Sequence, residues 1–317
     1  MKTEEPHRAG RVVAFGNQKG GVTKTSTVVN LAAALSEMGL RVLVWDLDVN
    51  CGCTRLFGVP AGVNVYGTFE VMTGDEQARD VIVRPGELEE ISLPANVDLI
   101  PAHTKLEGIE AALASKHGPF EVSHNALREP LASIKSMYDF VFLDTSPSMT
   151  PPTKAAYMAA EYFVLTAVPE RLAIEGLVNA IRYIQHAHSG GNESLRLMGV
   201  VMNQVPGRAT RLSQALLGEV DKHFGGGDEY RRPFETHISA STIVPSVQQG
   251  GQTLFDAAPE HKVTEQYRAL AREFVERFER FEQPEAEALT PRRPLQGGGP
   301  SSATTAEPRK EGGVLNG

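Results

Sequence analysis

The chain has 317 residues, of which 41% are hydrophobic and 22% charged, and its net charge is −8. This composition is typical of a soluble globular protein, and the acidic balance argues against a chain dedicated to coating nucleic acid. Two cysteines cannot form a disulfide framework, which indicates a reducing compartment. The N-terminus lacks the apolar core of a signal peptide, and no stretch reaches the roughly 18 consecutive apolar residues of a membrane span. We therefore expect a cytoplasmic protein that does not enter a membrane.

Composition changes at both ends of the chain. From 283 to 317 there is no aromatic residue, and prolines alternate with glycine clusters. A segment of this composition cannot offset its ordering entropy by burial, so we expect 283–317 to be a disordered tail. Residues 1–9 are expected to be a flexible N-terminus. The folded domain is therefore predicted to span residues 10–282.

Short apolar runs alternate with helical patterns through this domain. The runs are uninterrupted and rich in β-branched or aromatic residues, which favours parallel strands buried on both faces. They are residues 12–15, 42–45, 97–100, 140–143, 163–168 and 198–202, and the helical patterns among them are 25–38, 125–137, 155–160, 174–188 and 212–224. This alternation predicts an α/β fold with a doubly wound, mostly parallel sheet flanked by helices, and with ligands at the carboxyl ends of the strands.

A last helical pattern covers residues 263–278. Its apolar residues recur at spacings of three and four: Val263, Tyr267, Leu270, Phe274 and Phe278. The opposite face carries glutamates, which anionic lipid would repel. We therefore expect this helix to pack on the sheet rather than on a membrane.

The segment 15–27, FGNQKGGVTKTST, follows the first apolar run and leads into a helix. Adjacent glycines at 20 and 21 let backbone N–H groups turn inward around a phosphate, and the positive end of the helix adds to this attraction. Lys24 adds a mobile charge, and Thr25 can place its hydroxyl on Mg²⁺. The sequence therefore predicts a nucleotide site built from Lys19, Gly20, Gly21, Val22, Thr23, Lys24, Thr25 and Ser26.

This loop departs from the ordinary Walker pattern G-x-x-x-x-G-K-[ST], because Asn17 and Thr23 stand at its two glycine positions. It fits K-G-G-x-x-K-[ST] and, with Asn17 and Gln18 before it, resembles the loop of the ParA-type partition ATPases of the MinD-ParA superfamily. The resemblance implies a P-loop NTPase fold, ATP and Mg²⁺ as cofactors, and ATP hydrolysis. The family's extra lysine, here Lys19, crosses a dimer interface to the partner's nucleotide. Lys19 and Lys24 are thus predicted catalytic residues.

Two aspartates are expected at strand ends beside this loop. Asp48 follows the second apolar run and resembles the family aspartate that positions the attacking water, although the next residues, VNC, replace the usual Pro-Gln-Gly. Asp144 ends the fourth run in YDFVFLDTSPS and resembles a Walker B aspartate, which binds Mg²⁺ through water. We therefore predict Asp48 as a third catalytic residue, and Thr25 with Asp144 as the metal site.

Beyond these motifs the resemblance thins. Asn203 stands where several relatives have an asparagine that reads adenine, although it is equally a turn former at a strand end. Arg208 falls where the family has one of the arginines that bind DNA nonspecifically. The segment 238–243, ISASTI, resembles the family's I-P-R-N-V-R but carries no charge, and losing these phosphate contacts weakens salt-dependent affinity. DNA binding through Arg208 is still expected.

Cys51 and Cys53 are too few ligands for zinc or an iron–sulfur cluster, and we expect them to be small packing residues.

The resemblance implies an ATP-dependent homodimeric switch that hydrolyses ATP slowly. Such a switch segregates or positions plasmid or chromosomal DNA on the bacterial nucleoid, together with a ParB-like adaptor. Two alternatives remain open, namely a ParA-like ATPase that positions a protein cargo and a MinD-like spatial regulator of cell division. The second alternative should end in a basic amphipathic membrane helix, which the tail does not offer.

Overall fold

The structure of the chain is a computed structural model that describes residues 10–17, 21, 23–59, 65–88, 91–117, 125–169, 173–206 and 233–282. All of these except the last residue lie in one compact unit, Met1–Phe281. The predicted helix at 212–224 and both predicted terminal segments lie outside the described residues. The division of the chain into 1–9, 10–282 and 283–317 therefore stays a prediction.

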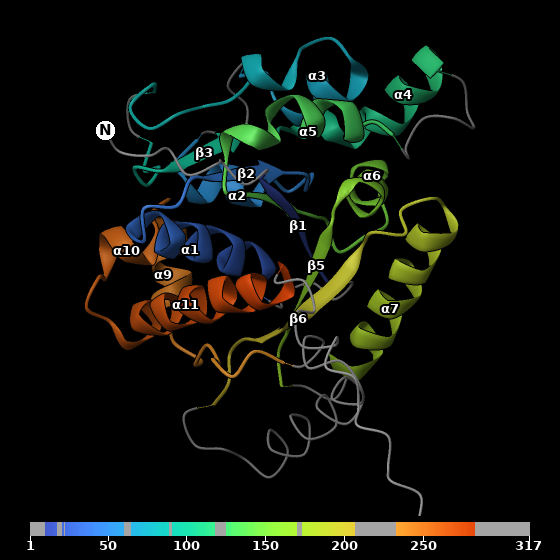
Figure 1. The fold of residues 1–317 in the computed structure, drawn as a ribbon. Helices are drawn as coiled ribbons and strands as arrows, with labels where there is room; N and C mark the ends of the chain where they lie inside the picture. Colours follow the sequence, from blue (N-terminus) through green and yellow to red (C-terminus); the bar gives the residue numbers. More distant parts are fainter. Residues whose placement is uncertain are drawn as a thin grey trace, which may run out of the picture. The chain divides into compact units, whose positions relative to one another are not determined.

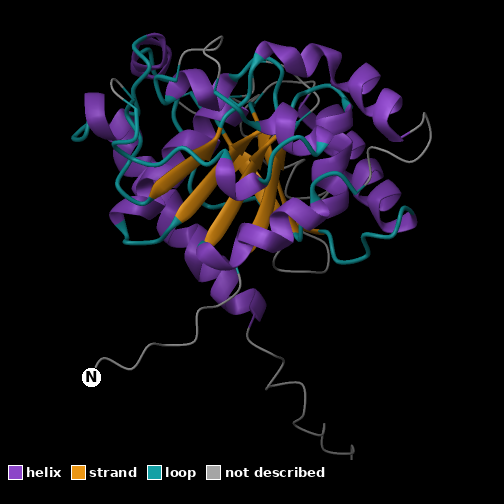
Figure 2. Ribbon diagram, turned by 90° about the horizontal axis from the view of Figure 1, so that it is seen from above, coloured by secondary structure: helices purple, strands orange, loops and turns teal. Residues whose placement is uncertain are grey.

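Within the described residues, six strands form one sheet in which every neighbouring pair is parallel (Figures 1 and 2). The strands are β1 (Arg11–Gly16), β2 (Val42–Asp46), β3 (Val97–Ile100), β4 (Phe140–Asp144), β5 (Tyr162–Ala167) and β6 (Arg196–Met202). Their order in the sheet is β3-β2-β4-β1-β5-β6. Each predicted apolar run forms a strand, so the prediction of a doubly wound parallel sheet is confirmed.

The register of the central strands decides which side chains meet at the carboxyl edge. Asp144, the last residue of β4, lies beside Phe15 of β1 and beside Asp46 of β2. The first loop of the chain and the two aspartate segments therefore leave the sheet next to one another, as expected for a ligand site of this fold class.

One face of the sheet is covered by the first and last helices of the chain (Figure 1). They are α1 (Lys24–Glu37), α2 (Gly52–Leu56), α9 (Ile243–Gln249), α10 (Leu254–Ala257) and α11 (Lys262–Glu282). The apolar side of α11 is fully buried: the rings of Phe274 and Phe278 lie 5.4 and 5.2 Å from the ring of Phe140. The expectation that this helix packs on the sheet is confirmed. No helix among the described residues has the length and hydropathy needed to cross a membrane.

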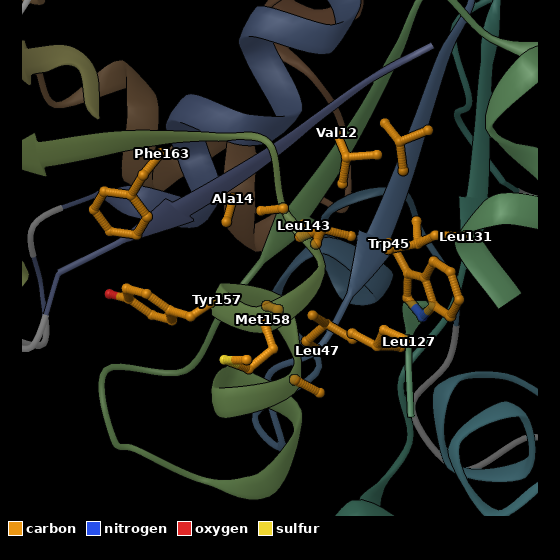
Figure 3. Close-up of a cluster of buried hydrophobic side chains, with 14 of the residues drawn as sticks. Val12, Ala14, Trp45, Leu47, Leu127, Leu131, Leu143, Tyr157, Met158 and Phe163 are labelled. Carbon is orange, nitrogen blue, oxygen red and sulfur yellow. The ribbon is translucent and has the colours of Figure 1, made fainter. Parts of the chain in front are cut away.

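The other face is covered by the middle helices of the chain (Figure 1). These are α3 (Thr68–Thr73), α4 (Ile109–His117), α5 (Arg128–Ile134), α6 (Pro151–Ala159) and α7 (Ala173–Ser189), with short 3-10 turns at Ala78–Asp80, Thr104–Gly108 and Lys135–Met137. Val12 and Ala14 of β1, Trp45 of β2 and Leu131 of α5 belong to the apolar cluster beneath them (Figure 3). Because both faces of the sheet are covered, every residue of β2 and β4 is buried.

Helix α11 also fixes a segment that runs beside the edge strand β6. The backbone N–H groups of Phe234 and Ile238 donate to the carbonyls of Val200 and Met202, each at 2.9 Å. From α11, the Glu273 carboxylate accepts the N–H groups of Glu235 and Thr236. This segment leads directly to the uncharged stretch 238–243.

Candidate active site

Two side-chain hydrogen bonds tie described residues of the loop after β1 to the strands β5 and β6 or the residues that follow them. The Asn17 amide donates to the Thr166 carbonyl at the end of β5, at 2.5 Å, and Gln204 donates to the Gly21 carbonyl at 3.3 Å. Helix α1 then begins at Lys24. Three predicted loop residues, Lys19, Gly20 and Val22, lie outside the part of the chain that the structure describes, and their roles stay predictions.

Backbone strain gathers around this edge of the sheet. Among the described residues, only three other than glycine have positive φ: Thr23 at 58°, Cys51 at 53° and Gln204 at 52°. Such conformations cost of order 1–3 kcal/mol each and persist where the surroundings enforce them. Thr23 and Cys51 therefore both hold a left-handed backbone that glycine adopts more readily.

Lys24, Thr25 and Asp144 form a hydrogen-bonded group at the carboxyl ends of β1 and β4. Lys24 Nζ donates to Asp144 Oδ1 at 2.6 Å, and Thr25 Oγ1 donates to Asp144 Oδ2 at 2.9 Å. Burial alone would lower the pKa of Lys24, but the adjacent carboxylate of Asp144 outweighs burial and raises it. Lys24 is therefore charged, and its charge is held inside the fold at the start of α1.

The same group has the donor chemistry of a magnesium site. A threonine hydroxyl and an aspartate carboxylate are hard oxygen donors, which Mg²⁺ prefers. Mg²⁺ in nucleotide sites takes one or two such protein ligands and fills its octahedron with phosphate oxygens and water. Thr25 and Asp144 fit this requirement, and their side chains are already within hydrogen-bond distance.

Asp48 lies beside this group and is 6% exposed. Its Oδ1 accepts the backbone N–H and the side-chain amide of Asn50, both at 3.0 Å. The charge of Asp48 also contributes to raising the pKa of Lys24. The structure thus brings Asp48, Lys24 and Asp144 to one edge of the sheet.

Asp46 is a buried carboxylate whose role the sequence did not reveal. Its Oδ2 accepts the N–H and the hydroxyl of Thr54, at 2.9 and 2.7 Å, and its Oδ1 accepts the Asp48 N–H at 3.1 Å. Burial and the nearby charge of Asp144 raise the pKa of Asp46 to about 7. Asp46 therefore holds together the two ends of the segment that carries Asp48.

Asn203 lies at the end of β6 and is 1% exposed. Its side-chain amide donates to Thr27 Oγ1 of α1 at 3.0 Å, and its backbone N–H donates to the Ala167 carbonyl. These contacts tie β6 to the first turns of α1. A role for Asn203 in reading a base stays a prediction.

A cavity of about 650 Å³ opens beside the loop. Thr23, Gln204 and Tyr267 line it, together with residues 238–242, Val244, Pro245 and Gln248. From this lining Gln248 donates to the hydroxyl of Ser26 in the first turn of α1. Sequence reasoning missed Gln204 and Gln248, because no local pattern marks a residue that reaches the loop from so far along the chain.

The predicted DNA-binding residue, Arg208, lies outside the described residues. The segment 238–243 is described, and Ala240 and Thr242 within it are exposed. This surface beside the cavity carries no charge of its own.

Known proteins resemble this chain over most of its length. A family model described as an AAA domain matches residues 10–197. The chromosome-partitioning ATPase Soj of Thermus thermophilus is 34% identical over 269 residues, which are 85% of this chain and 97% of that protein. The chain belongs to the ParA-type partition ATPases. The chromosome partitioning protein ParA of Caulobacter vibrioides is 33% identical over 217 residues, 68% of this ParA-type chain and 77% of its own length.

Solved structures share the fold of this ParA-type chain. One, described as cobyrinic acid a,c-diamide synthase of Mycobacterium smegmatis with bound ADP and magnesium, gives a TM-score of 0.69 at 28% identity and covers 85% of this chain and 96% of its own. A complex of a Cyanothece McdA variant with ATP gives a TM-score of 0.70 at 17% identity, over 84% and 97% of the two chains. The predicted P-loop NTPase fold is confirmed.

Proposed function

We propose that this chain is a Mg²⁺-dependent ATPase that works as a partition switch. The observation that carries the proposal is the hydrogen-bonded group of Lys24, Thr25 and Asp144 at the carboxyl edge of the sheet, in which Lys24 and Asp144 are buried. The M. smegmatis relative, whose structure contains ADP and magnesium, supports the choice of ligand.

Each residue of the group has a role that its chemistry suits. Lys24 and the loop amides hold the β- and γ-phosphates, with Ser26 adding a hydroxyl in the first turn of α1. Thr25 and Asp144 hold Mg²⁺, which neutralises charge on the phosphate oxygens when it is bound. Lys24 is already at the start of the helix, and it exchanges its contact with Asp144 for the phosphates when nucleotide binds.

Hydrolysis is assigned to Asp48, which orients the attacking water. A carboxylate suits this task because phosphoryl transfer depends mainly on positioning and on charge stabilisation. Asp46 supports it by accepting the Asp48 N–H. Lys19 is proposed to reach the nucleotide of a second copy, so that ATP builds a homodimer.

In the bacterial cytoplasm, the ATP-bound dimer would bind nucleoid DNA without sequence preference, through Arg208, and a ParB-like adaptor would stimulate slow hydrolysis to release it. The similarity to the partitioning proteins of Thermus and Caulobacter supports this cycle. The cargo is then a chromosome or a plasmid.

Asp48→Ala and Lys24→Ala separate binding from hydrolysis. Asp48→Ala should still bind Mg²⁺-ATP and should accumulate as dimers on a sizing column, because the dimer forms but cannot hydrolyse its ATP. Lys24→Ala should lose ATP binding and stay monomeric. Monomeric Asp48→Ala protein in saturating ATP would contradict the switch, and unchanged turnover in Lys24→Ala would contradict the phosphate assignment.

DNA binding is tested by ATP-dependent retention on nonspecific duplex at low and moderate salt. Retention that weakens with salt is expected from phosphate contacts. Arg208→Ala should reduce both the retention and its salt dependence. Dimers that are not retained at either salt concentration would count against DNA as the matrix.

The uncharged surface at 238–243 favours one second candidate, a ParA-like ATPase that positions a protein cargo. This candidate has the same nucleotide site and the same ATP-dependent dimer, and it differs only in the cellular surface to which the dimer binds. ATP-dependent dimers without DNA retention are the result that it predicts.

A further inference from the structure

Asp144 is held by three side chains, two from the start of α1 and one from α2. Lys24 Nζ donates to Oδ1 at 2.6 Å, whereas Oδ2 accepts both the Thr25 hydroxyl at 2.9 Å and the Cys53 thiol at 3.2 Å. Cys53 is 0% exposed and lies in the short helix α2 after the Asp48 segment. The sequence had indicated only a packing residue here.

The hydrogen bond from Cys53 to Asp144 joins a weak donor to a good acceptor. A thiol S–H is a weak donor, and the Asp144 carboxylate oxygen that it faces lies 3.2 Å from the sulfur.

Nucleotide binding is expected to affect the three hydrogen bonds of Asp144 differently. Under the proposed function, Lys24 turns to the phosphates and Thr25 gives its oxygen to Mg²⁺. Cys53 contacts neither the phosphates nor the metal in this scheme. Its hydrogen bond to Asp144 therefore remains when nucleotide and Mg²⁺ are bound.

Helix α2 is well placed to hold the thiol still. A β-carbon added to Gly52 would lie 2.9 Å from Thr25 Cγ2, so the first turn of α2 packs tightly on the residue that binds the metal. On the other side of Cys53, the backbone N–H and the hydroxyl of Thr54 both donate to the buried carboxylate of Asp46. Cys53 thus stands between two fixed neighbours.

We propose that Cys53 is a positioning residue for the metal ligand Asp144, joining the Mg²⁺ site to the segment that carries Asp48. The proposal rests on the proposed function, because it assumes that Asp144 serves Mg²⁺. It adds that the thiol keeps Oδ2 oriented once Lys24 and Thr25 have turned to the nucleotide.

The test measures by calorimetry, without turnover, how the affinity for ADP rises with Mg²⁺ concentration. The readout is the midpoint, which is the Mg²⁺ concentration at which half of the gain in ADP affinity is reached. Cys53→Ala should raise this midpoint about fivefold, the equivalent of losing one hydrogen bond of about 1 kcal/mol. Cys53→Ser keeps a donor of similar size and should stay within about twofold of the wild type. ADP binding in EDTA should be the same in all variants.

Cys51 supplies the matched control. It is also a fully buried cysteine, two residues away, but its thiol faces the Val49 carbonyl and not Asp144. Cys51→Ala should therefore leave the Mg²⁺ midpoint unchanged, and thermal unfolding without nucleotide checks that each variant folds.

Three results would overturn the positioning role: a wild-type midpoint in Cys53→Ala, a shift in Cys51→Ala as large as that in Cys53→Ala, or a failure of Cys53→Ser to restore the midpoint. Failure of the proposed function itself would look different. The wild-type chain would then bind ADP no better with Mg²⁺ than with EDTA, and the positioning role would fall with it.

Discussion

Removing the charge of Lys24 should destabilise the nucleotide-free protein as well as abolish phosphate binding. Lys24 is 7% exposed and Asp144 0%, and their N···O distance is 2.6 Å. At an effective dielectric constant of about 20, two unit charges at this distance attract by about 6 kcal/mol, part of which offsets their desolvation. Taking away one partner of a buried pair costs about 3–5 kcal/mol, because the other charge stays buried.

We expect the lower end of this range, about 3 kcal/mol, for Lys24→Met, since Thr25 and Cys53 still donate to Asp144. The assay is a double-mutant cycle of Lys24→Met and Asp144→Asn, followed by urea unfolding in EDTA without nucleotide. Each single variant leaves one buried charge unpaired and the double variant leaves none. The double variant should therefore recover about 2 kcal/mol or more relative to additivity, and it should still fail to bind ATP.

The half-exposed pair of Lys135 and Glu161, 2.9 Å apart, provides the control for this cycle. Its coupling should stay below about 1 kcal/mol because solvent screens it. If the effects of Lys24→Met and Asp144→Asn add to within about 0.5 kcal/mol, the buried pair does not exist in the nucleotide-free protein.

Three further predictions concern stability in urea. Thr23→Gly should stabilise the protein by about 1 kcal/mol, because glycine adopts a φ of 58° without strain; a loss of stability would mean that the threonine side chain is needed. In EDTA, the raised pKa of Asp46 keeps it protonated in the folded state after it has ionised in the unfolded state. Stability should therefore fall by a few kcal/mol between about pH 4 and 7, and an equally steep fall in Asp46→Asn would contradict this cause. Phe274→Ala should cost about 3–5 kcal/mol, because the ring is fully buried among other rings; a cost below about 1 kcal/mol would show that α11 is not anchored there.

The strands were predictable because each is buried on both faces and reads as a continuous apolar run. Two of the shortest helices were not. α2, with the sequence GCTRL, and α10, with LFDA, are too short to show a helical period, and tertiary contacts hold them in place. The predicted helix at 155–160 begins earlier, at Pro151. Prolines suit the first turn of a helix, but in a sequence pattern they indicate a helix break.

The residue types of the site were also predictable, whereas its internal contacts were not. Asp48 and Asp144 follow apolar runs, so their place at the carboxyl edge follows from the fold class. The contacts of Cys53 with Asp144 and of Gln248 with Ser26 depend on which strands and helices are neighbours in space. Sequence spacing does not contain that information, and so the sequence indicated a packing role for Cys53 and no role for Gln248.

The sheet order has a consequence for how the protein is made. β1, the first strand of the chain, lies between β4 and β5, whose residues begin at Phe140 and Tyr162. Contacts so distant in sequence require long loops to close and therefore form late in folding. A growing chain that ends before Phe140 carries Lys24 and Thr25 but has neither the neighbouring strands nor Asp144. The nucleotide site can therefore assemble only late in synthesis, and a nascent chain is kept from binding ATP before its core exists.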